Sequence, residues 1–347
     1  MRKKKILYIC GSLNQTTMMH KISGELSEYD NYFTPFYADG IIKSLANAGF
    51  LDFSILGGQF RKNTIQYLKD NKLQLDFEGQ LHKYDLVFTC TDLIIQNNIK
   101  NKKIILVQEG MTDAENILFR LVKRLKLPRF LAGTAATGQS DAYEYFCVAS
   151  EGYKEFFIEK GLNREKLVVT GIPNFDYCRQ YLLNDFPYEK YVLVATSDAR
   201  ETFKYENRKK FIEKCLRVAD GRQLIFKLHP NEKIKRAIKE INKYAPGSVI
   251  FSSGNTNHMI ANCDTLITRF SSVVYVGLAL GKKVYSEFDI DMLKKLVPLQ
   301  NSGGSAKNIA AVAYELLNAK DLKIFRLPPK TNNMKAGNFK NRIVKIA

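Results

Sequence analysis

Short runs of apolar residues, separated by longer amphipathic stretches, constrain the fold of this chain more than any other feature. The runs are rich in Val, Ile, Leu and Tyr, and they are apolar throughout rather than at every second position. Strands with that composition are typically buried on both faces of a parallel sheet. Their alternation with helical segments predicts a doubly wound α/β fold. We expect strands at 4–10, 52–56, 85–90, 103–107, 144–149, 166–170, 191–195, 223–228, 248–252, 264–268 and 283–287.

The strand–helix pattern begins twice, which predicts two Rossmann-like domains that face each other across a cleft. The first pattern starts at Lys3 with KKKILYICGSLNQ and the second at Glu189 with EKYVLVATSDARE. The stretch between them is interrupted by prolines, so we place a linker near 174–188. The chain has 347 residues, 45% of them apolar, which is enough for two cores. The predicted units are a first domain at 1–178, a second at 186–320, and a basic segment at 321–347 that is either frayed or crosses back to the first domain.

Several protein classes lose support from the composition. No run of about 18 or more apolar residues occurs, so we expect no membrane-spanning helix. The N-terminus is basic and then apolar like a signal peptide, but its apolar run, Ile6–Cys10, is short, and a first strand is the better interpretation. The six cysteines are scattered and form no CxxC, which indicates free thiols and a cytoplasmic protein. The sequence has no G-x-G-x-x-G and no Walker loop, so dinucleotide and P-loop chemistry are disfavoured.

The net charge of +18, from 53 Lys and Arg against 35 Asp and Glu, predicts an anionic partner. Nucleic acid, anionic lipid headgroups and phosphorylated substrates all fit that charge. The charge alone does not choose among them.

A carboxylate follows one of the predicted strands. After Ile104–Val107 come Gln108, Glu109 and Gly110, and Gly110 permits a sharp turn. Thr112 and Glu115 then form a T-x-x-E capping box that begins a helix. Glu109 is therefore expected at the lip of the cleft, either as a catalytic carboxylate or as a charge that stabilises the helix dipole.

A histidine ends another strand. In LIFKLHPNEK the strand stops at His229, and Pro230 fixes the backbone after it. Imidazole can donate a hydrogen bond to a phosphate oxygen or carry a proton, although it can also simply cap a turn. We expect His258 to be structural within a helix, and the contexts of His20 and His82 indicate no role.

Hydroxyl groups follow three further strands. After Thr265–Thr268, Ser271 and Ser272 are expected to begin a helix whose free N–H groups could bind an anion, although plain capping is equally common. Two other pairs give a weaker signal of the same kind: Thr196 with Ser197 in the second half, and Gly11 with Ser12 in the first.

A D-x-D pair, Asp289 and Asp291, follows a late strand. Such pairs bind metal in some glycosyltransferases, but the position in a loop after a strand disfavours that here. We expect no metal and no cofactor.

These motifs together resemble the GT-B glycosyltransferases. FCVASEGYKEFFIEKGLNREKLVVTGIPNFD resembles the end of their first domain, and FKLHPNE followed by CDTLITRFSSVVYVGLALGKKV resembles their donor-binding half. The closest similarity is to bacterial sialyltransferases, Kdo transferases and CDP-glycerol glycerophosphotransferases, with UDP-N-acetylglucosamine 2-epimerases more distant. The resemblance covers most of 1–320 through short motifs. It implies an acceptor-binding first domain and a second domain that binds the nucleotide donor.

The resemblance also implies roles for individual residues. Sialyltransferases and Kdo transferases carry an acidic pair before a glycine, then His-Pro, then one or two serines. The first acid is Gln108 in this chain, so the resemblance leaves Glu109 as the base, and His229 joins it as a catalytic residue. The residues implied to bind nucleotide or phosphate are Thr196, Ser197, His229, Pro230, Ser271 and Ser272; those on the acceptor side are Gly11, Ser12, Gln108 and Gly110.

The favoured activity is therefore a metal-independent inverting transfer from a nucleotide sugar, of the CMP-ulosonic acid type, to a glycan or lipid-linked acceptor of the cell envelope or capsule. One alternative is a CDP-glycerol-type polyol phosphotransferase, although these enzymes carry Asp where this chain has Arg269. Epimerases carry an acid shortly after the serines, and Val273 to Gly277 offers none. A basic nucleic-acid-binding protein and a non-catalytic GT-B scaffold are the remaining alternatives; no nucleic-acid-binding motif occurs.

A basic amphipathic helix is predicted shortly after Glu109. In TDAENILFRLVKRLKLPRF, one face holds the apolar residues Ile117, Leu118, Leu121, Val122 and Leu125, and the rest is basic: Arg120, Lys123, Arg124 and Lys126. Such a helix can lie on an anionic membrane surface, and the basic tail from Lys323 onward could add to that surface. Equally, the apolar face could pack on the core while the cations face water.

Overall fold

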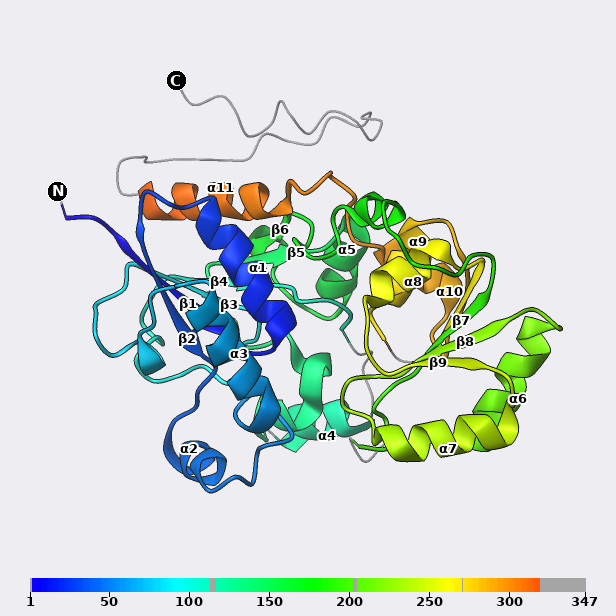
Figure 1. The fold of residues 1–347 in the computed structure, drawn as a ribbon. Helices are drawn as coiled ribbons and strands as arrows, with labels where there is room; N and C mark the ends of the chain where they lie inside the picture. The colour runs from blue at the N-terminus through cyan, green and yellow to red at the C-terminus, as the bar shows by residue number, and fades with distance from the viewer. Residues whose placement is uncertain (1, 113–116, 126, 202–204, 270, 319–347) are drawn as a thin grey trace.

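The computed structural model describes all residues except 1, 113–116, 126, 202–204, 270 and 319–347, and its strands form two parallel sheets (Figure 1). The first sheet has six strands in the order β2-β1-β3-β4-β5-β6, and the second has five in the order β11-β10-β7-β8-β9. Every pairing between these strands is parallel, so the predicted α/β fold with two Rossmann-like domains is confirmed. The strands of the first sheet are β1 (Lys5–Cys10), β2 (Asp30–Pro35), β3 (Leu86–Thr89), β4 (Ile104–Val107), β5 (Tyr145–Val148) and β6 (Leu167–Val169). Those of the second are β7 (Val192–Ala195), β8 (Leu224–Lys227), β9 (Val249–Phe251), β10 (Thr265–Thr268) and β11 (Lys283–Tyr285).

One predicted strand is wrong, and one strand was missed. Residues 52–56 form turns and bends, whereas the edge strand beside β1 is β2. The β2 sequence DNYFTP begins with Asp and ends with Pro, both of which are rare in strands. Proline is tolerated there because β2 lies at the edge of the sheet, where one side of the strand needs no ladder hydrogen bonds.

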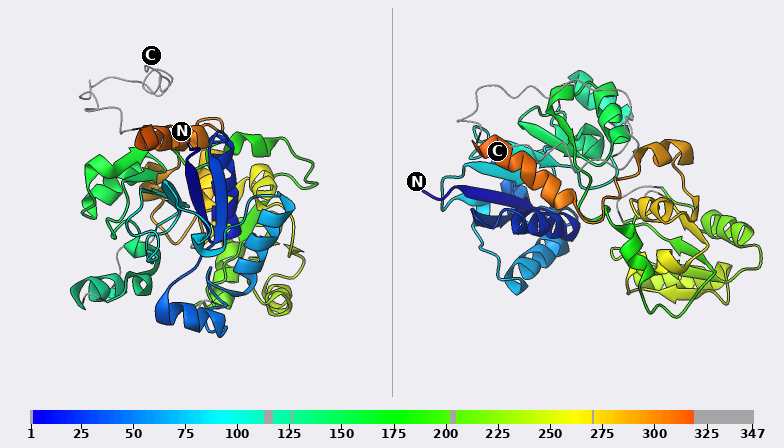
Figure 2. Two further views of the ribbon diagram at one scale, coloured as in Figure 1. Left: turned by 90° about the vertical axis from the view of Figure 1, so that its left-hand side faces the viewer. Right: turned by 90° about the horizontal axis from the view of Figure 1, so that it is seen from above.

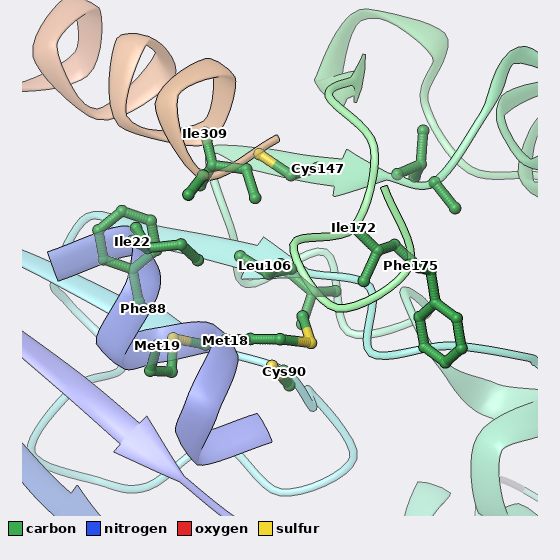
Figure 3. Close-up of a cluster of buried hydrophobic side chains, with 14 of the residues drawn as sticks. Met18, Met19, Ile22, Phe88, Cys90, Leu106, Cys147, Ile172, Phe175 and Ile309 are labelled. Atoms are coloured by element: carbon green, nitrogen blue, oxygen red, sulfur yellow. The ribbon is translucent and has the colours of Figure 1, made fainter. Parts of the chain in front are cut away.

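Helices cover both sheets. In Figure 3, Met18, Met19 and Ile22 of α1 pack toward Phe88 of β3 and Leu106 of β4. These side chains are buried, and they anchor α1 so that its N-terminus meets the carboxyl ends of the strands. The helices of the first part of the chain are α1 (Leu13–Gly24), α2 (Gly40–Asn47), α3 (Gly58–Asp70), α4 (Ile117–Leu125) and α5 (Glu151–Glu159), with short 3₁₀ segments η1 (Phe77–Gly79), η2 (Arg129–Ala136), η3 (Arg164–Lys166) and η4 (Cys178–Leu182). Those that follow are α6 (Arg208–Ala219), α7 (Ile234–Tyr244), α8 (Thr256–Asn262), α9 (Val274–Ala279), α10 (Ile290–Leu296) and α11 (Ser305–Asn318).

The last described helix, α11, returns to the first domain and lies along α1 (Figures 1 and 2). Lys4 and Lys103 donate hydrogen bonds of 2.8 and 2.7 Å from their Nζ atoms to the carbonyls of Leu317 and Leu316. These bonds cap the C-terminal end of α11, where free carbonyls favour cations. The chain thus crosses between domains before residue 318. The basic segment predicted to cross at 321–347 lies outside the described residues, and the predicted limits 1–178 and 186–320 remain a proposal.

The two domains meet through α5 and α10. Gly152 of α5 lies so close to α10 that a Cβ atom there would come within 1.9 Å of the carbonyl oxygen of Lys295. Close by, the buried hydroxyls of Tyr153 and Tyr275 form a hydrogen bond across the same junction. These contacts join α5, which follows β5 of the first sheet, to α9 and α10, which follow β10 and β11 of the second.

All six cysteines are free and buried. Within the described residues, no helix is both long and apolar enough to cross a bilayer.

Candidate functional site

A cavity of about 390 Å³ lies between the carboxyl edge of the first sheet and the second domain. Its size falls in the range of pockets that hold small-molecule ligands, about 300 to 1,000 Å³. The loop after β4 and the turn before α9 form opposite walls. The lining residues include Asn14, Gln15, Ile55, Cys90, Thr91, Gln108, Glu109, Gly110, Thr134, Thr137, Ser271, Ser272 and Phe288.

Glu109 lies in this cavity and is held by the N-terminus of α1. Its Oε1 accepts hydrogen bonds from Ser12 Oγ at 2.8 Å and from Asn14 Nδ2 at 3.3 Å, and its Oε2 accepts one from Gln15 Nε2. Ser12 is also the N-cap of α1, because its Oγ accepts from the backbone N–H of Gln15 at 3.2 Å. The carboxylate is therefore fixed by polar donors from another element, not by a helix that follows it.

Gly11 is needed for this arrangement. A Cβ atom at Gly11 would lie 2.1 Å from Gln15 Oε1, so any other residue would displace the Gln15 side chain. Glycine therefore follows β1 because Gln15 must lie over that position to reach Glu109. This gives the predicted acceptor-side pair, Gly11 and Ser12, a structural reason, although neither residue lines the cavity.

Gln108 and Gly110 shape the turn around Glu109. Gln108 is buried; its Nε2 donates to the carbonyl of Gly110 at 2.8 Å, and its Oε1 accepts from the N–H of Ala149 at 2.9 Å. Because both ends of the amide are used by the backbone, Gln108 positions the loop instead of offering a free group to a ligand. Gly110 faces the second domain: a Cβ there would lie 3.6 Å from the Cβ of Ser272.

The turn at Ser271 and Ser272 forms the opposite wall, but it differs from the prediction. The helix α9 begins at Val274, with Val273 as its N-cap and no side-chain cap hydrogen bond. The carbonyls of Ser271 and Ser272 accept from Val274 and Tyr275 at 3.2 and 3.0 Å, so a tight turn precedes the helix. The predicted serine cap is therefore wrong: Ser271 Oγ accepts from the N–H of Val273, at 3.5 Å, and both serines line the cavity from a turn.

His229 lies with Thr196 and Ser197 at the carboxyl edge of the second sheet. None of the three lines this cavity. The N–H of His229 donates to Thr196 Oγ1 and to Glu232 Oε2, both at 3.0 Å. Its Nδ1 accepts from the N–H of Asn231 at 3.3 Å. These bonds orient the ring, which is about one-third exposed.

The remaining predicted residues at this edge differ in exposure. Pro230 is exposed, whereas Ser197 is buried, and its Oγ has no hydrogen-bond partner among the described residues. A buried hydroxyl without a partner is a donor that a ligand could use.

Sequence reasoning missed a buried ionic network beside His229. Glu232 forms an ion pair with Arg208, and Arg208 Nε lies 2.6 Å from Glu206 Oε1. Glu206 also pairs with Arg269, whose Nη1 lies 3.1 Å from Oε2. Burial lowers the pKa of the neighbouring Lys227, and Glu232 opposes that shift. Glu232 in HPNE was the sequence signal for this network, because a carboxylate that is buried requires charged partners.

Asp289 and Asp291 serve a helix. Asp289 is the N-cap of α10 and accepts from the N–H groups of Asp291 and Met292 at 2.8 and 2.9 Å, while Asp291 pairs with Lys294 at 3.0 Å. Among the described residues, no three His, Cys, Asp or Glu side chains gather in a way that could hold a metal ion. The other histidines also have local partners: His258 lies in α8 as predicted, His20 contacts the hydroxyl of Tyr67, and His82 packs on the ring of Tyr32.

The basic helix after Glu109 is present, but its buried face differs from the prediction. Phe119 and Val122 of α4 are buried against Ala132 and Ala135 of η2. Leu121 and Leu125, predicted on the apolar face, are exposed. The capping-box residue Glu115 and Lys126 lie outside the described residues, and so do the side chains of Ile117 and Leu118.

Solved structures with a similar fold include enzymes that act on nucleotide sugars. One is the UDP-GlcNAc 2-epimerase from Neisseria meningitidis bound to UDP-GlcNAc, with a TM-score of 0.55 and 12% identity over 90% of this chain and 100% of that one. Another is S. aureus MnaA with UDP, with a TM-score of 0.56 and 12% identity over 92% and 99%. The UDP-GlcNAc 2-epimerase from Methanocaldococcus jannaschii with UDP-GlcNAc and UDP has a TM-score of 0.52 and 14% identity over 89% and 99%.

At such low identity these similarities show the fold, which is of the GT-B type, and not the reaction. No family model matches the sequence, and no curated protein matches it.

Proposed function

We propose that this protein is a metal-independent inverting glycosyltransferase that uses a nucleotide-activated sugar, with a CMP-ulosonic acid as the preferred donor class. The observation that carries the proposal is that Glu109 and Ser272 line one cavity from opposite domains. An inverting transfer needs that arrangement. The acceptor oxygen, which loses its proton to the base, attacks the donor carbon on the side opposite the bond to the departing phosphate. The acceptor is a glycan or a lipid-linked glycan of the cell envelope or capsule, at the cytoplasmic face of the membrane.

Glu109 acts as the general base in this proposal. It takes the proton of the acceptor hydroxyl as the oxygen attacks the donor carbon, and a new C–O bond forms with inversion. The bonds from Ser12, Asn14 and Gln15 hold the carboxylate still, so that little reorganisation accompanies proton transfer.

The second domain stabilises the leaving group. The bond between the donor carbon and the phosphate oxygen breaks, and negative charge grows on the departing nucleotide. The hydroxyls of Ser271 and Ser272 and the ring of His229 would donate to that phosphate, and the buried Ser197 hydroxyl offers a further donor. Thr196 and Pro230 hold the His229 turn.

The alternatives have less support. An epimerase would need an acid after the serines, whereas Val273 to Gly277 at the start of α9 carries none. Arg269 occupies the place where polyol phosphotransferases carry Asp, and here its charge is taken up by Glu206 and Glu287. A nucleic-acid-binding role would show as a salt-sensitive gel shift with random RNA.

The first experiment is a thermal-shift screen with CMP, CDP, UDP and GDP. Binding to the folded state raises the apparent stability by mass action, so the nucleotide with the largest shift identifies the donor class. We expect CMP to give the largest shift, and we expect transfer from a CMP-ulosonic acid to continue in EDTA. A preference for CDP would support the polyol phosphotransferase instead. If none of the four nucleotides binds, the non-catalytic scaffold is the supported alternative.

A further inference from the structure

Large apolar side chains are exposed on two segments that are far apart in the sequence but lie at the same end of the first domain. The first segment is α2 with the loop after it, where Ile41 is 80% exposed, Phe50 69% and Phe53 67%. The second is α4, where Leu121 is 46% and Leu125 57% exposed. Both helices lie at the lower end of that domain in Figure 1 and in the left view of Figure 2.

These side chains contribute little to the fold. None of the residues of α2 is buried, although its sequence GIIKSLAN is apolar on one side. In α4 the inward positions Phe119 and Val122 already fill the contact with η2, so the exposed leucines are not needed there. Exposed apolar groups of this size that serve no core indicate a contact with a partner.

The charge beside the exposed leucines of α4 is positive, whereas the loop with Phe50 and Phe53 carries the exposed Asp52. Arg120, Lys123 and Arg124 of α4 are exposed. The sequence from 117 to 136 holds five Lys or Arg residues and no Asp or Glu. On α2, Lys43 is half-exposed and already paired with Glu78 at 2.7 Å, so α2 adds apolar contact and α4 adds the charge.

We propose that this end of the first domain docks on an anionic lipid bilayer. The docking surface consists of Ile41, Phe50, Phe53, Leu121 and Leu125 with the three cations of α4. Aromatic and aliphatic side chains would enter the headgroup layer, and Arg and Lys would contact lipid phosphates while their stems remain in apolar surroundings. Two separate points of insertion at one end suit an extended plane better than a groove of another protein.

The docking surface goes beyond the transfer reaction and does not depend on it. The segment η2 packs against α4, and its residue Thr134 lines the cavity, so a docked enzyme would hold the cavity close to the membrane. A lipid-linked acceptor could then reach Glu109 without leaving the bilayer.

Vesicle flotation with the full chain tests the proposal. Vesicles of phosphatidylcholine alone are compared with vesicles that also contain phosphatidylglycerol, at low and at high salt. We expect binding to the anionic vesicles only, weakened by salt because lipid charge is screened. Reversal of three charges in Arg120→Glu, Lys123→Glu and Arg124→Glu should lower the partition constant by roughly a hundredfold or more. The double change Phe50→Ser and Phe53→Ser should lower it by about tenfold or more.

Matched variants on other surfaces serve as controls. Lys209→Glu, Lys210→Glu and Arg217→Glu reverse three exposed charges on α6, and Leu182→Ser with Leu183→Ser removes two exposed apolar side chains at the end of η4. The Leu182 and Leu183 control should bind anionic vesicles within about threefold of wild type. The α6 control measures the general effect of net charge, and beyond that effect it should also bind within about threefold of wild type.

Three results would overturn the proposal. The first is a wild type that does not float with anionic vesicles. The second is equal loss in the α4 and α6 charge variants, which would show only non-specific attraction. The third is a concentration-dependent dimer that the Phe50 and Phe53 changes abolish without any effect on flotation, which would make this surface an interface between two copies. Nucleotide binding in vesicle-free solution should be unchanged in all four variants, so failure of the docking surface is distinguishable from failure of the proposed transfer.

Discussion

Ser12 Oγ donates a 2.8 Å hydrogen bond to Glu109 Oε1 across 97 positions of sequence. The same serine caps α1, so the residue that begins the first helix also fixes the carboxylate that follows β4. Because β1 and β4 both end at the same edge of one parallel sheet, the two residues meet there. The opposite wall comes from the second domain, at Ser272.

Glu109→Gln should abolish transfer and leave nucleotide binding nearly unchanged. A general base contributes roughly 100- to 10,000-fold, and glutamine keeps the size of the side chain while it loses the ability to take a proton. Steady-state kinetics and nucleotide titration together measure this. Glu144→Gln, an exposed change before β5, is the control. If the Glu109 variant keeps more than about half of the wild-type rate, the carboxylate has a structural role only.

Removal of the hydroxyls in Ser271→Ala with Ser272→Ala, and removal of the ring in His229→Ala, should each weaken nucleotide binding and slow transfer. Each group would touch the phosphate in both the ground state and the transition state, and one hydrogen bond to a charged group is worth about 1.5 to 3 kcal/mol. Calorimetric titration with the preferred nucleotide measures the loss. Asp289→Asn on α10 should have no effect on binding. If the serine variant binds the nucleotide as tightly as wild type, the turn before α9 is not part of the donor site.

Side chains of increasing size at Gly110 should close the cavity gradually. An alanine Cβ would make ordinary contacts of 3.6 and 3.9 Å with Ser272 and Phe175, so Gly110→Ala should retain most activity. Gly110→Leu would fill the space between Glu109 and Ser272 and should lower kcat/KM by more than roughly tenfold, since displacement of substrate by about 1 Å is costly. The melting temperature shows whether both variants are folded. Equal activity of the two variants would mean that the substrate does not pass Gly110.

Gly152→Ala should destabilise the contact between α5 and α10. The new Cβ would lie 1.9 Å from the Lys295 carbonyl oxygen, so the backbone must shift, and overpacking of this kind costs about 1 to 3 kcal/mol. Chemical unfolding measures the change in the free energy of unfolding. Gly24→Ala at the end of α1 is the control, because no atom outside the neighbouring backbone lies within 4 Å of its added Cβ. Similar stability of the two variants would show that the junction is not tightly packed.

The pair Arg200–Glu240 should make stability depend on acid pH. Two hydrogen bonds of 2.8 Å from Arg200 hold the pKa of Glu240 below its usual value in the folded state. The unfolded carboxylate takes up its proton first as pH falls, so the stabilisation is present above the unfolded pKa and is lost as pH falls through the folded pKa. Glu240→Gln should therefore lower the free energy of unfolding by about 1 to 2 kcal/mol at pH 7 and flatten its decline below about pH 4.5. An equally steep decline in the variant would assign the acid sensitivity to other carboxylates.

The fold class and the positions of most strands could be predicted from the pattern of apolar residues. A strand buried on both faces must be apolar throughout, so runs such as Ile104–Val107 and Val192–Ala195 are visible without any knowledge of their neighbours. The sequence also pointed to polar residues after those strands, among them Glu109 and His229, because the carboxyl ends of parallel strands share one edge.

The contacts that hold these residues in place could not be predicted, because they come from segments that are far apart in the sequence. The partners of Glu109 come from the start of α1, the ionic partner of Glu232 is the first residue of α6, and the buried face of α4 is set by η2. The edge strand Asp30–Pro35 is a strand because β1 lies beside it, despite its weak local preference. Periodicity and turn chemistry act over a few neighbouring residues, whereas hydrogen bonds and ion pairs between distant segments depend on how the whole chain packs.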